Sequence, residues 1–261
     1  MSETRELEHF ARTAAARGKV LDLENQRRCE DSLLEFIGCM WPVVDPAEKF
    51  VTGWPLEAIC DHLQAVTEGY IKRLIINVPP GSTKSTAMYM FTAWEWGPRN
   101  MPSMRYVCAS YSDDLPERDT LKCKSVVESP RYRRLWGDRF GPHASLNSKR
   151  KFGNDHTGWR MATSPEGIGI GERGDRFILG DPNNQDVESS IVRKKVNLWF
   201  TEIVPSRLNN LKRKRDHSHS ATLARRGLHG HGLGKGYGIH ASVHSVGIRT
   251  KAVLQERFHN R

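Results

Sequence analysis

The sequence lacks long apolar runs and paired cysteine motifs, and both absences exclude classes of protein. No stretch approaches the ~20 apolar residues that a membrane-spanning helix needs, and the first residues carry no hydrophobic secretory segment. The five cysteines are odd in number and never form a C-x-x-C pair, which argues against a disulfide framework or a zinc knuckle. We therefore expect a cytoplasmic protein whose thiols are reduced and mostly buried.

Excess positive charge is also lacking over most of the chain. The net charge is +10, but residues 211–261 hold 11 Lys/Arg and only 2 Asp/Glu, whereas the first 210 residues hold 29 and 28. A basic surface is the electrostatic signature of a nucleic-acid-binding protein. The near-neutral body therefore gives no evidence of DNA binding from its charge alone.

What the sequence does contain is enough apolar character for a globular fold of 261 residues. Apolar residues make up 38%, a little below the usual share of a soluble domain, and charged residues make up 27%, an ordinary share. Helical patterns alternate with short β-branched runs, which predicts an α/β fold with a mainly parallel sheet and helices on both faces. We expect helices at 1–45, ended by Trp41-Pro42, and at 56–67, 85–96, 115–127 and 187–204; strands at 73–78, 105–110 and 176–179; and a hairpin around 154–158.

After Asn210 the composition changes abruptly. Residues 211–261 hold seven of the eleven histidines and seven glycines, with no sustained period of 2 or 3.6 residues. Such a tract can bind metal or nucleic acid, and four of its histidines stand in close pairs, at His217, His219, His229 and His231. The lack of cysteine or carboxylate partners favours the simpler interpretation of a disordered or accidental tail.

The strongest local signal is a Gly-x-x-Lys-Ser turn between a buried strand and a helix. Backbone N–H groups of such a turn and the helix N-terminus concentrate positive charge on an anion, as in nucleotide-binding loops. Lys84 would reach the β- and γ-phosphates, and the Ser85 hydroxyl would bind Mg²⁺. An ordinary surface loop is the alternative, since a standard loop has glycine where this chain has Val78 and Thr83, but the strand before it and the helix after it favour nucleotide. The candidate nucleotide-binding residues are Pro80, Gly81, Ser82, Thr83, Lys84, Ser85 and Thr86.

Several further segments, in order along residues 34–211, resemble the large terminase subunits of tailed phages. In that family two prolines precede the Lys-Ser pair and the glycine before the lysine is absent, as in NVPPGSTKS at residues 77–85. The other matching segments are FVTGWPLEAICDHLQAV (50–66), TAWEWGP (92–98), ASYSDDLPERDTLKC (109–123), ESPRYRRLWGDRF (128–140), NDHTGWRMATS (154–164) and GERGDRFILGDPNN (171–184).

The resemblance implies a P-loop ATPase of the additional-strand type, with ATP and Mg²⁺ as cofactors. Such proteins form homo-oligomeric rings at the capsid portal, translocate double-stranded viral DNA and work with the portal protein and the terminase small subunit. It also implies an adenine site near residues 50–66 and an arginine acting on nucleotide within 111–118, for which Arg118 is the candidate; an ion pair with Glu117 or Asp119 is the alternative. We divide the chain into an N-terminal helical segment (1–45), the ATPase domain (46–210) and the atypical tail (211–261).

One departure from the family concerns the acidic strand. Members usually end it with two carboxylates, one for Mg²⁺ and one for the attacking water, whereas this chain has Gly180-Asp181. Asp181 is then the remaining catalytic carboxylate and, with Ser85, the candidate metal ligand. Since phosphoryl transfer depends on both functions, we expect weak nucleotide binding and impaired hydrolysis.

A second departure is that the family's next hydrophobic strand and its nuclease domain are not recognisable after Asn210. We hypothesise a frameshift near codon 211, and we expect the lost strand to leave an exposed sheet edge. The alternative functions are a helicase-like ATPase, for which further motifs are missing, and a non-catalytic prophage remnant. Reading the other two frames of the gene beyond codon 211 tests the frameshift, because one of them must then encode an apolar strand and an acidic nuclease core.

Overall fold

The computed structural model describes residues 2–78, 81–110, 114–164, 172–180, 221–225 and 238–242, with side chains from residue 16 up to 180 within these ranges. Six helices and eight strands are formed by these residues. The helices are α1 (Ser2–Asp31), α2 (Leu33–Val44), α3 (Trp54–Thr67), α4 (Lys84–Trp96), α5 (Asp114–Glu128) and α6 (Pro130–Trp136). The strands are β1 (Arg73–Asn77), β2 (Arg105–Ala109), β3 (Pro142–Asn147), β4 (Lys151–Asn154), β5 (Trp159–Thr163), β6 (Arg176–Leu179), β7 (Ala221–Arg225) and β8 (Gly238–Ser242).

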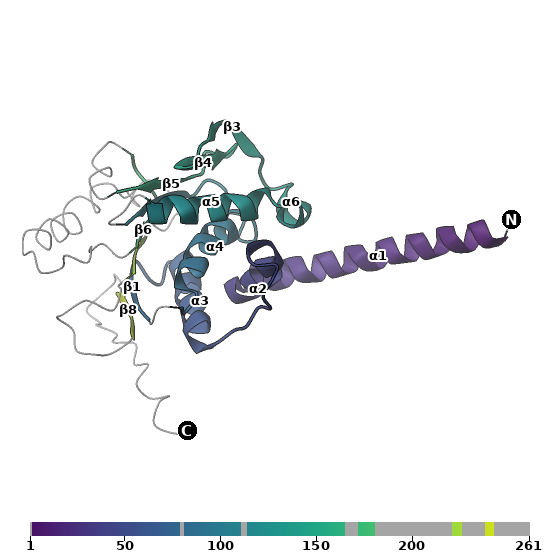
Figure 1. The fold of residues 1–261 in the computed structure, drawn as a ribbon, viewed down its shortest axis with the longest axis horizontal. Helices are drawn as coiled ribbons and strands as arrows, with labels where there is room; N and C mark the ends of the chain where they lie inside the picture. The colour runs from purple at the N-terminus through teal and green to yellow at the C-terminus, as the bar shows by residue number, and fades with distance from the viewer. Residues whose placement is uncertain are drawn as a thin grey trace, which may run out of the picture.

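All eight strands form one sheet in the order β3-β4-β5-β2-β6-β7-β1-β8. The central pairings β5–β2, β2–β6, β6–β7 and β7–β1 are parallel, and the pairings nearer the two edges are antiparallel. In Figure 1 the helices α3, α4 and α5 lie together beside this sheet, while α1 extends away from the body toward the N-terminus. The mixed α/β fold with a mainly parallel centre agrees with the sequence prediction. The helix expected at 187–204 lies outside the described residues.

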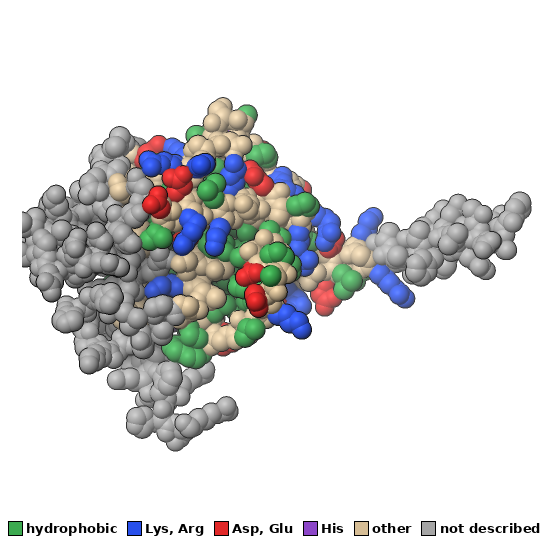
Figure 2. Space-filling view, viewed as in Figure 1, with side chains coloured by type: hydrophobic (Ala, Val, Ile, Leu, Met, Phe, Trp, Pro, Cys, Tyr) green, Lys and Arg blue, Asp and Glu red, His purple; other side chains and the backbone are tan. Residues whose placement is uncertain are grey.

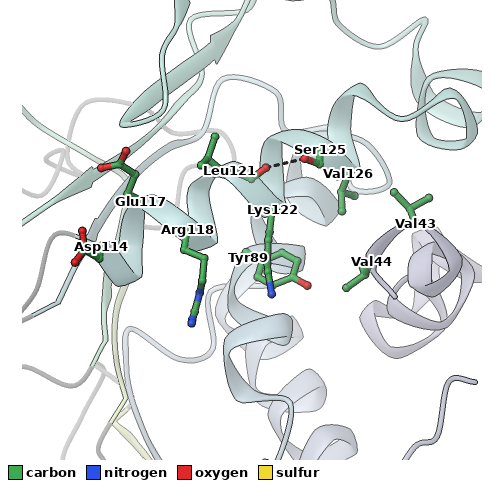
Figure 3. A pocket seen from close by; sticks show the side chains of 10 residues that line it. All are labelled: Val43, Val44, Tyr89, Asp114, Glu117, Arg118, Leu121, Lys122, Ser125 and Val126. Atoms are coloured by element: carbon green, nitrogen blue, oxygen red, sulfur yellow. Dashed lines mark hydrogen bonds between the residues drawn. The ribbon is translucent and has the colours of Figure 1, made fainter. Parts of the chain in front are cut away.

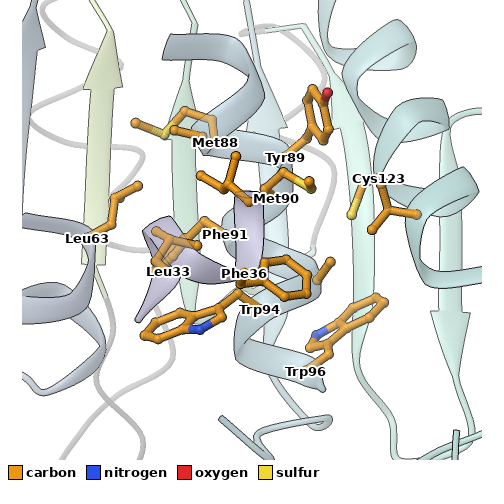
Figure 4. Close-up of a cluster of buried hydrophobic side chains, with 14 of the residues drawn as sticks. Leu33, Phe36, Leu63, Met88, Tyr89, Met90, Phe91, Trp94, Trp96 and Cys123 are labelled. Atoms are coloured by element: carbon orange, nitrogen blue, oxygen red, sulfur yellow. The ribbon is translucent and has the colours of Figure 1, made fainter. Parts of the chain in front are cut away.

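Helix α4 is the centre of the hydrophobic core. Every residue from Ala87 to Trp96 is buried, because α3, α5 and α2 pack around the helix. The two indoles also satisfy their polar atoms: Trp94 Nε1 donates to the Cys29 carbonyl at 2.7 Å, and Trp96 Nε1 donates to the Met104 carbonyl at 2.9 Å. Figure 4 shows these rings packed with Phe36 and Phe91 beneath the sheet strands. The first helix after the Gly-x-x-Lys-Ser turn is thereby held rigidly.

A buried ion pair joins α4 to the strand β6. Glu95 and Arg176 are both fully buried, with Arg176 Nη2 2.7 Å from Glu95 Oε1 and Arg176 Nε 3.2 Å from Oε2. Thr67 Oγ1 donates to the same carboxylate at 2.7 Å, and the Tyr106 hydroxyl donates to it as well. Burial, reinforced by the Glu95 carboxylate, raises the pKa of Tyr106 well above its usual value, so this hydroxyl remains a donor.

Most expected elements are confirmed within one or two residues, including the strands at β1, β2 and β6 and the antiparallel β4–β5 hairpin. The prediction that Trp41-Pro42 ends the first helical region is wrong, because Pro42 lies inside α2, which continues to Val44. A proline this close to the end removes little: the helix closes with Asp45 N donating to the Trp41 carbonyl at 2.8 Å. The helix expected at residues 1–45 is also interrupted at Ser32. The Ser32 side chain accepts a hydrogen bond from Glu35 N and so caps α2.

The expectation that no strand follows Asn210 is also wrong. β7 lies between β6 and β1 and pairs in parallel with both, and β8 pairs antiparallel with the other side of β1. No exposed edge therefore arises between β6 and β1 within the described residues. The ladder needs only backbone N–H and C=O groups, so a short segment without a clear apolar period can complete it. The domain boundaries at 45 and 210 stay predictions.

Candidate functional site

The Gly-x-x-Lys-Ser turn connects the carboxyl end of β1 to the first residue of α4. The strand is followed by Val78, which is buried, and α4 begins at Lys84. Lys84 Nζ lies 3.4 Å from the Val78 carbonyl oxygen, so the lysine side chain folds back across the turn toward the end of the strand. Gly81 has a φ of +80°, and a Cβ built there meets no atom within 4 Å. The turn thus presents open backbone at the N-terminus of a buried helix, which is the geometry that suits an anion.

Thr83 occupies the position just before α4 in a left-handed conformation, with φ 51° and ψ 16°. This conformation explains why glycine is usual at this place in nucleotide-binding loops, since a β-branched residue is strained there. The Thr83 hydroxyl donates to the Ser82 carbonyl at 2.8 Å, and the Thr83 carbonyl accepts from Ala87 N at 3.0 Å. Ser82, Thr83, Lys84 and Ser85 therefore lie together in one turn, whereas Pro80 lies outside the described residues.

We predict that Thr83→Gly leaves the free energy of unfolding unchanged or raises it by up to about 1 kcal/mol. Relief of left-handed strain, about 1–2 kcal/mol, exceeds the entropic cost of glycine, about 0.5–1 kcal/mol. Thr86→Gly is the matched control, because Thr86 lies inside α4, where glycine is a few tenths of a kcal/mol less favourable than threonine. Urea denaturation of both variants measures the difference. If both variants lose the same free energy of unfolding, the backbone of Thr83 is not strained.

The strand β6 reaches the same edge of the sheet as β1. Leu179 and Ile75 both pair with Ala224, so they lie level on strands two positions apart, roughly 10 Å from each other. Gly180 follows, and its N–H donates to the Ala109 carbonyl at 2.7 Å. Asp181, the predicted catalytic and metal-binding carboxylate, lies outside the described residues. Since no side chain exists at position 180, only a residue after it can supply a carboxylate from this strand.

A small cavity of about 20 Å³ lies beside Gly180; of its two charged residues, sequence reasoning missed Arg160 and named Asp119 only as an ion-pair partner of Arg118. Asp119 on α5 and Arg160 on β5 are both buried, and both line it together with Ser110. Arg160 Nη1 lies 2.5 Å from Thr92 Oγ1 on α4, and its Nε donates to Thr120 Oγ1 at 3.3 Å. These contacts tie α4, α5 and β5 together just beneath the carboxyl edge. The sequence signal that could have revealed Arg160 is that it is an arginine within a short strand of otherwise largely apolar residues, Trp159–Thr163.

Arg118 lies in the first turns of α5 and forms an ion pair with its neighbour. Its Nη2 is 2.9 Å and its Nε 3.2 Å from Asp119 Oδ1, and half of its side chain is exposed. Figure 3 shows it at the border of a cavity of about 510 Å³ between α5, α4 and the end of α2. Burial raises the pKa of Tyr89, on the α4 wall of this cavity, to about 12, so the phenol is neutral. An ion pair with Asp119 is one of the two alternatives that the sequence analysis gave for Arg118. Its predicted action on a nucleotide stays a prediction.

The described surface mixes both signs of charge. In the face shown in Figure 2, lysine and arginine side chains lie among acidic ones over the helices. This agrees with the near-neutral composition of the first 210 residues. The four tail histidines considered as zinc ligands lie outside the described residues, and within the described part no cluster of three or more His, Cys, Asp or Glu side chains is arranged to hold a metal. No described helix combines the length and apolarity needed to cross a bilayer.

No protein-family model and no curated protein matches the sequence. Among solved structures, the chain is similar to the large terminase of bacteriophage HK97, with a TM-score of 0.48 and 11% identity over 76% of this chain and 37% of that one. It is also similar to the large terminase ATPase domain of Thermus phage P74-26, with a TM-score of 0.39 and 15% identity over 68% of this chain and 65% of that one. The chain thus spans just over a third of the HK97 protein and slightly under two thirds of the Thermus phage domain. At these identities the similarity concerns the fold alone.

Proposed function

We propose that this chain binds ATP with Mg²⁺ and is the ATPase part of a DNA-packaging motor of the terminase large-subunit type. The observation that carries the proposal is the turn from Val78 to Lys84, which joins β1, a strand parallel to β7, to a buried helix and has Lys84 at the helix start. The order of terminase-like sequence segments supports the same assignment.

The residues of the turn have distinct roles in this proposal. Main-chain N–H groups from Gly81 to Ser85 bind the phosphates, together with the charge at the α4 N-terminus, and Lys84 turns from the Val78 carbonyl to the γ-phosphate. Ser85 and Asp181 are the residues suited to hold Mg²⁺, because hydroxyl and carboxylate oxygens are its preferred ligands. When bound, Mg²⁺ neutralises the charge that develops on the phosphate oxygens.

Hydrolysis is impaired in this proposal because one of the two expected carboxylates is absent. The position before Asp181 is Gly180, whose backbone N–H is held by the Ala109 carbonyl. A single carboxylate then has to serve either the metal or the attacking water. This observation also favours the second candidate function, a non-catalytic prophage remnant with at most weak nucleotide binding.

Double-stranded viral DNA, the portal protein, the terminase small subunit and further copies of this chain in a ring are the partners that this function requires. They would meet the chain transiently at the procapsid portal in the bacterial cytoplasm. The near-neutral charge of residues 1–210 means that DNA contact in the ring depends on local basic side chains rather than on a uniformly positive body.

We predict that Lys84→Ala lowers the affinity for MgATP at least about tenfold, a loss of about 1.4 kcal/mol. The lysine contributes a positive charge at the phosphates that alanine cannot replace. Isothermal titration of the full chain with MgATP measures the change. Lys124→Ala is the matched control, because the ion pair of Lys124 with Glu128 is long, at 3.9 Å, and lies within α5.

The same titration separates the two candidate functions. Binding by the parent chain and the Lys124 variant, with a loss in the Lys84 variant, supports the nucleotide site. Binding by neither the parent nor the Lys84 variant supports the remnant. Equal binding by both would place the nucleotide elsewhere and refute the assignment of this turn.

A further inference from the structure

Two cysteines from neighbouring helices line the same cavity. Cys29 lies in the last turns of α1 and is buried, and Cys39 lies on α2 and is half-buried. Both line a cavity of about 350 Å³ whose other walls include Glu35, Gly38 and Phe50. All five cysteines are free, and Cys39 is the only one that is not fully buried.

An arginine from a third helix lies against the more accessible thiol. Arg131 Nη2, from α6, donates to Cys39 Sγ at 3.5 Å, and Arg131 Nε is buried with no hydrogen-bond partner among the described residues. A guanidinium that is incompletely paired stabilises a thiolate better than a neutral thiol. The contact therefore places a positive charge where a sulfur anion can form.

The other groups around Cys39 also affect the pKa of its thiol. The hydrogen bond from Cys29, followed by the hydrogen bond and charge of Arg131 and the charge of Arg28, lowers the pKa of Cys39 to about 6, against the raising effect of burial. The pKa of Cys29 is raised, mainly by the same hydrogen bond and then by burial, with the Glu35 carboxylate adding to it. Arg28 is itself paired with Glu35, so its charge is partly neutralised. The Cys39 thiol therefore ionises more readily than the Cys29 thiol.

We propose that Cys39 and Cys29 form an oxidisable thiol pair that a peroxide converts to a disulfide linking α1 to α2. The Cys39 thiolate attacks one peroxide oxygen and the O–O bond breaks; with one proton taken up, this yields the sulfenic acid and a molecule of water. The Cys29 sulfur then attacks the Cys39 sulfur, the S–O bond breaks, and the hydroxide leaves as water with the Cys29 proton. Two thiols lose two electrons in total, and the peroxide gains them.

The linkage has a structural consequence for the N-terminal helix. The C-terminal part of α1 is held to the body by contacts such as Gln26 Nε2 donating to the Leu135 carbonyl and Arg134 pairing with Asp22 at 3.1 Å. A disulfide would add a covalent tie across the break between α1 and α2 at Ser32. Oxidation would thereby fix the direction in which α1 leaves the body.

The first test treats the full chain at pH 7 with a small excess of hydrogen peroxide and maps the thiols by mass spectrometry. We expect the intact mass to fall by two hydrogens and one cross-linked peptide to join Cys29 and Cys39. In Cys29→Ser, dimedone should instead capture a sulfenic acid at Cys39. Cys60→Ser, which removes a buried thiol elsewhere, should react like the parent. Oxidation of other cysteines in preference to Cys39, or no cross-link in the parent, would overturn the proposal.

The second test measures the alkylation rate of Cys39 by iodoacetamide as a function of pH. We expect a midpoint near the pKa of about 6, and at pH 7 a rate about three- to sixfold above that of an ordinary exposed thiol, since lower nucleophilicity offsets most of the gain in thiolate. Arg131→Gln should move the midpoint up by at least about one unit, and Arg131→Lys should restore much of the shift. A midpoint near 9 in the parent, or no movement in Arg131→Gln with the fold intact by circular dichroism, would refute the role of Arg131.

Discussion

Replacing Gly180 with aspartate is expected to raise the rate of ATP hydrolysis by roughly two orders of magnitude. A single well-placed polar group in an active site is commonly worth about 10² to 10³ in rate, and phosphoryl transfer relies on a placed metal and a positioned water. The backbone at position 180 already has a fixed place, because its N–H donates to the Ala109 carbonyl at 2.7 Å. Aspartate keeps that hydrogen bond and adds the missing carboxylate beside Asp181.

The matched control is Gly180→Asn, which has the same shape and no charge. Phosphate release under saturating MgATP measures the rate for the parent chain and both variants. A gain in the aspartate variant alone supports the assignment of the acidic strand. No gain, or an equal gain with asparagine, would show that the absent carboxylate does not limit hydrolysis.

Glu95→Gln is expected to destabilise the fold by about 3–5 kcal/mol, because it leaves the charge of Arg176 buried without a partner. Both side chains are fully buried, and Arg176 Nη1 already lacks a hydrogen-bond partner among the described residues. Thr67 and Tyr106, which both donate to the same carboxylate, would lose charged acceptors as well. For a chain of this size the loss corresponds to a fall of about 6–20 °C in the unfolding midpoint.

Glu117→Gln is the control for this second change. Glu117 pairs with Arg150 at 3.3 Å, and the arginine side chain is 63% exposed; exposed pairs are worth about 0–1 kcal/mol. Thermal and urea unfolding of both variants gives the comparison. If Glu95→Gln costs no more than Glu117→Gln, the buried pair does not hold α4 against β6.

Part of the site could be predicted because its signals are local. A β-branched run before the Gly-x-x-Lys-Ser turn and an apolar helix after it predicted β1 and α4 to within a residue or two. Hydrogen bonds within a helix and the alternation of side chains in a strand depend on near neighbours in the chain. For the same reason the strand at β6 and its end at Gly180 could be located without knowing which strands flank it.

Other features depend on groups that are distant in the chain. Nothing local marks residues 221–225 as a strand, and their place between β6 and β1 follows from backbone pairing on both sides. The partnership of Glu95 with Arg176, 81 positions apart, was likewise absent from the pattern of residues. So was the meeting of Arg131 with Cys39, 92 positions apart.

The sequence by itself determined where this protein places its Gly-x-x-Lys-Ser turn, which helix follows it, and that position 180 lacks a carboxylate. Only the tertiary structure decided that a strand from beyond residue 220 completes the centre of the sheet, that a carboxylate on α4 neutralises an arginine on β6, and that two cysteines line one cavity beside a guanidinium. The physical reason is that local patterns encode backbone conformation, whereas burial and charge pairing arise only when separate elements pack together.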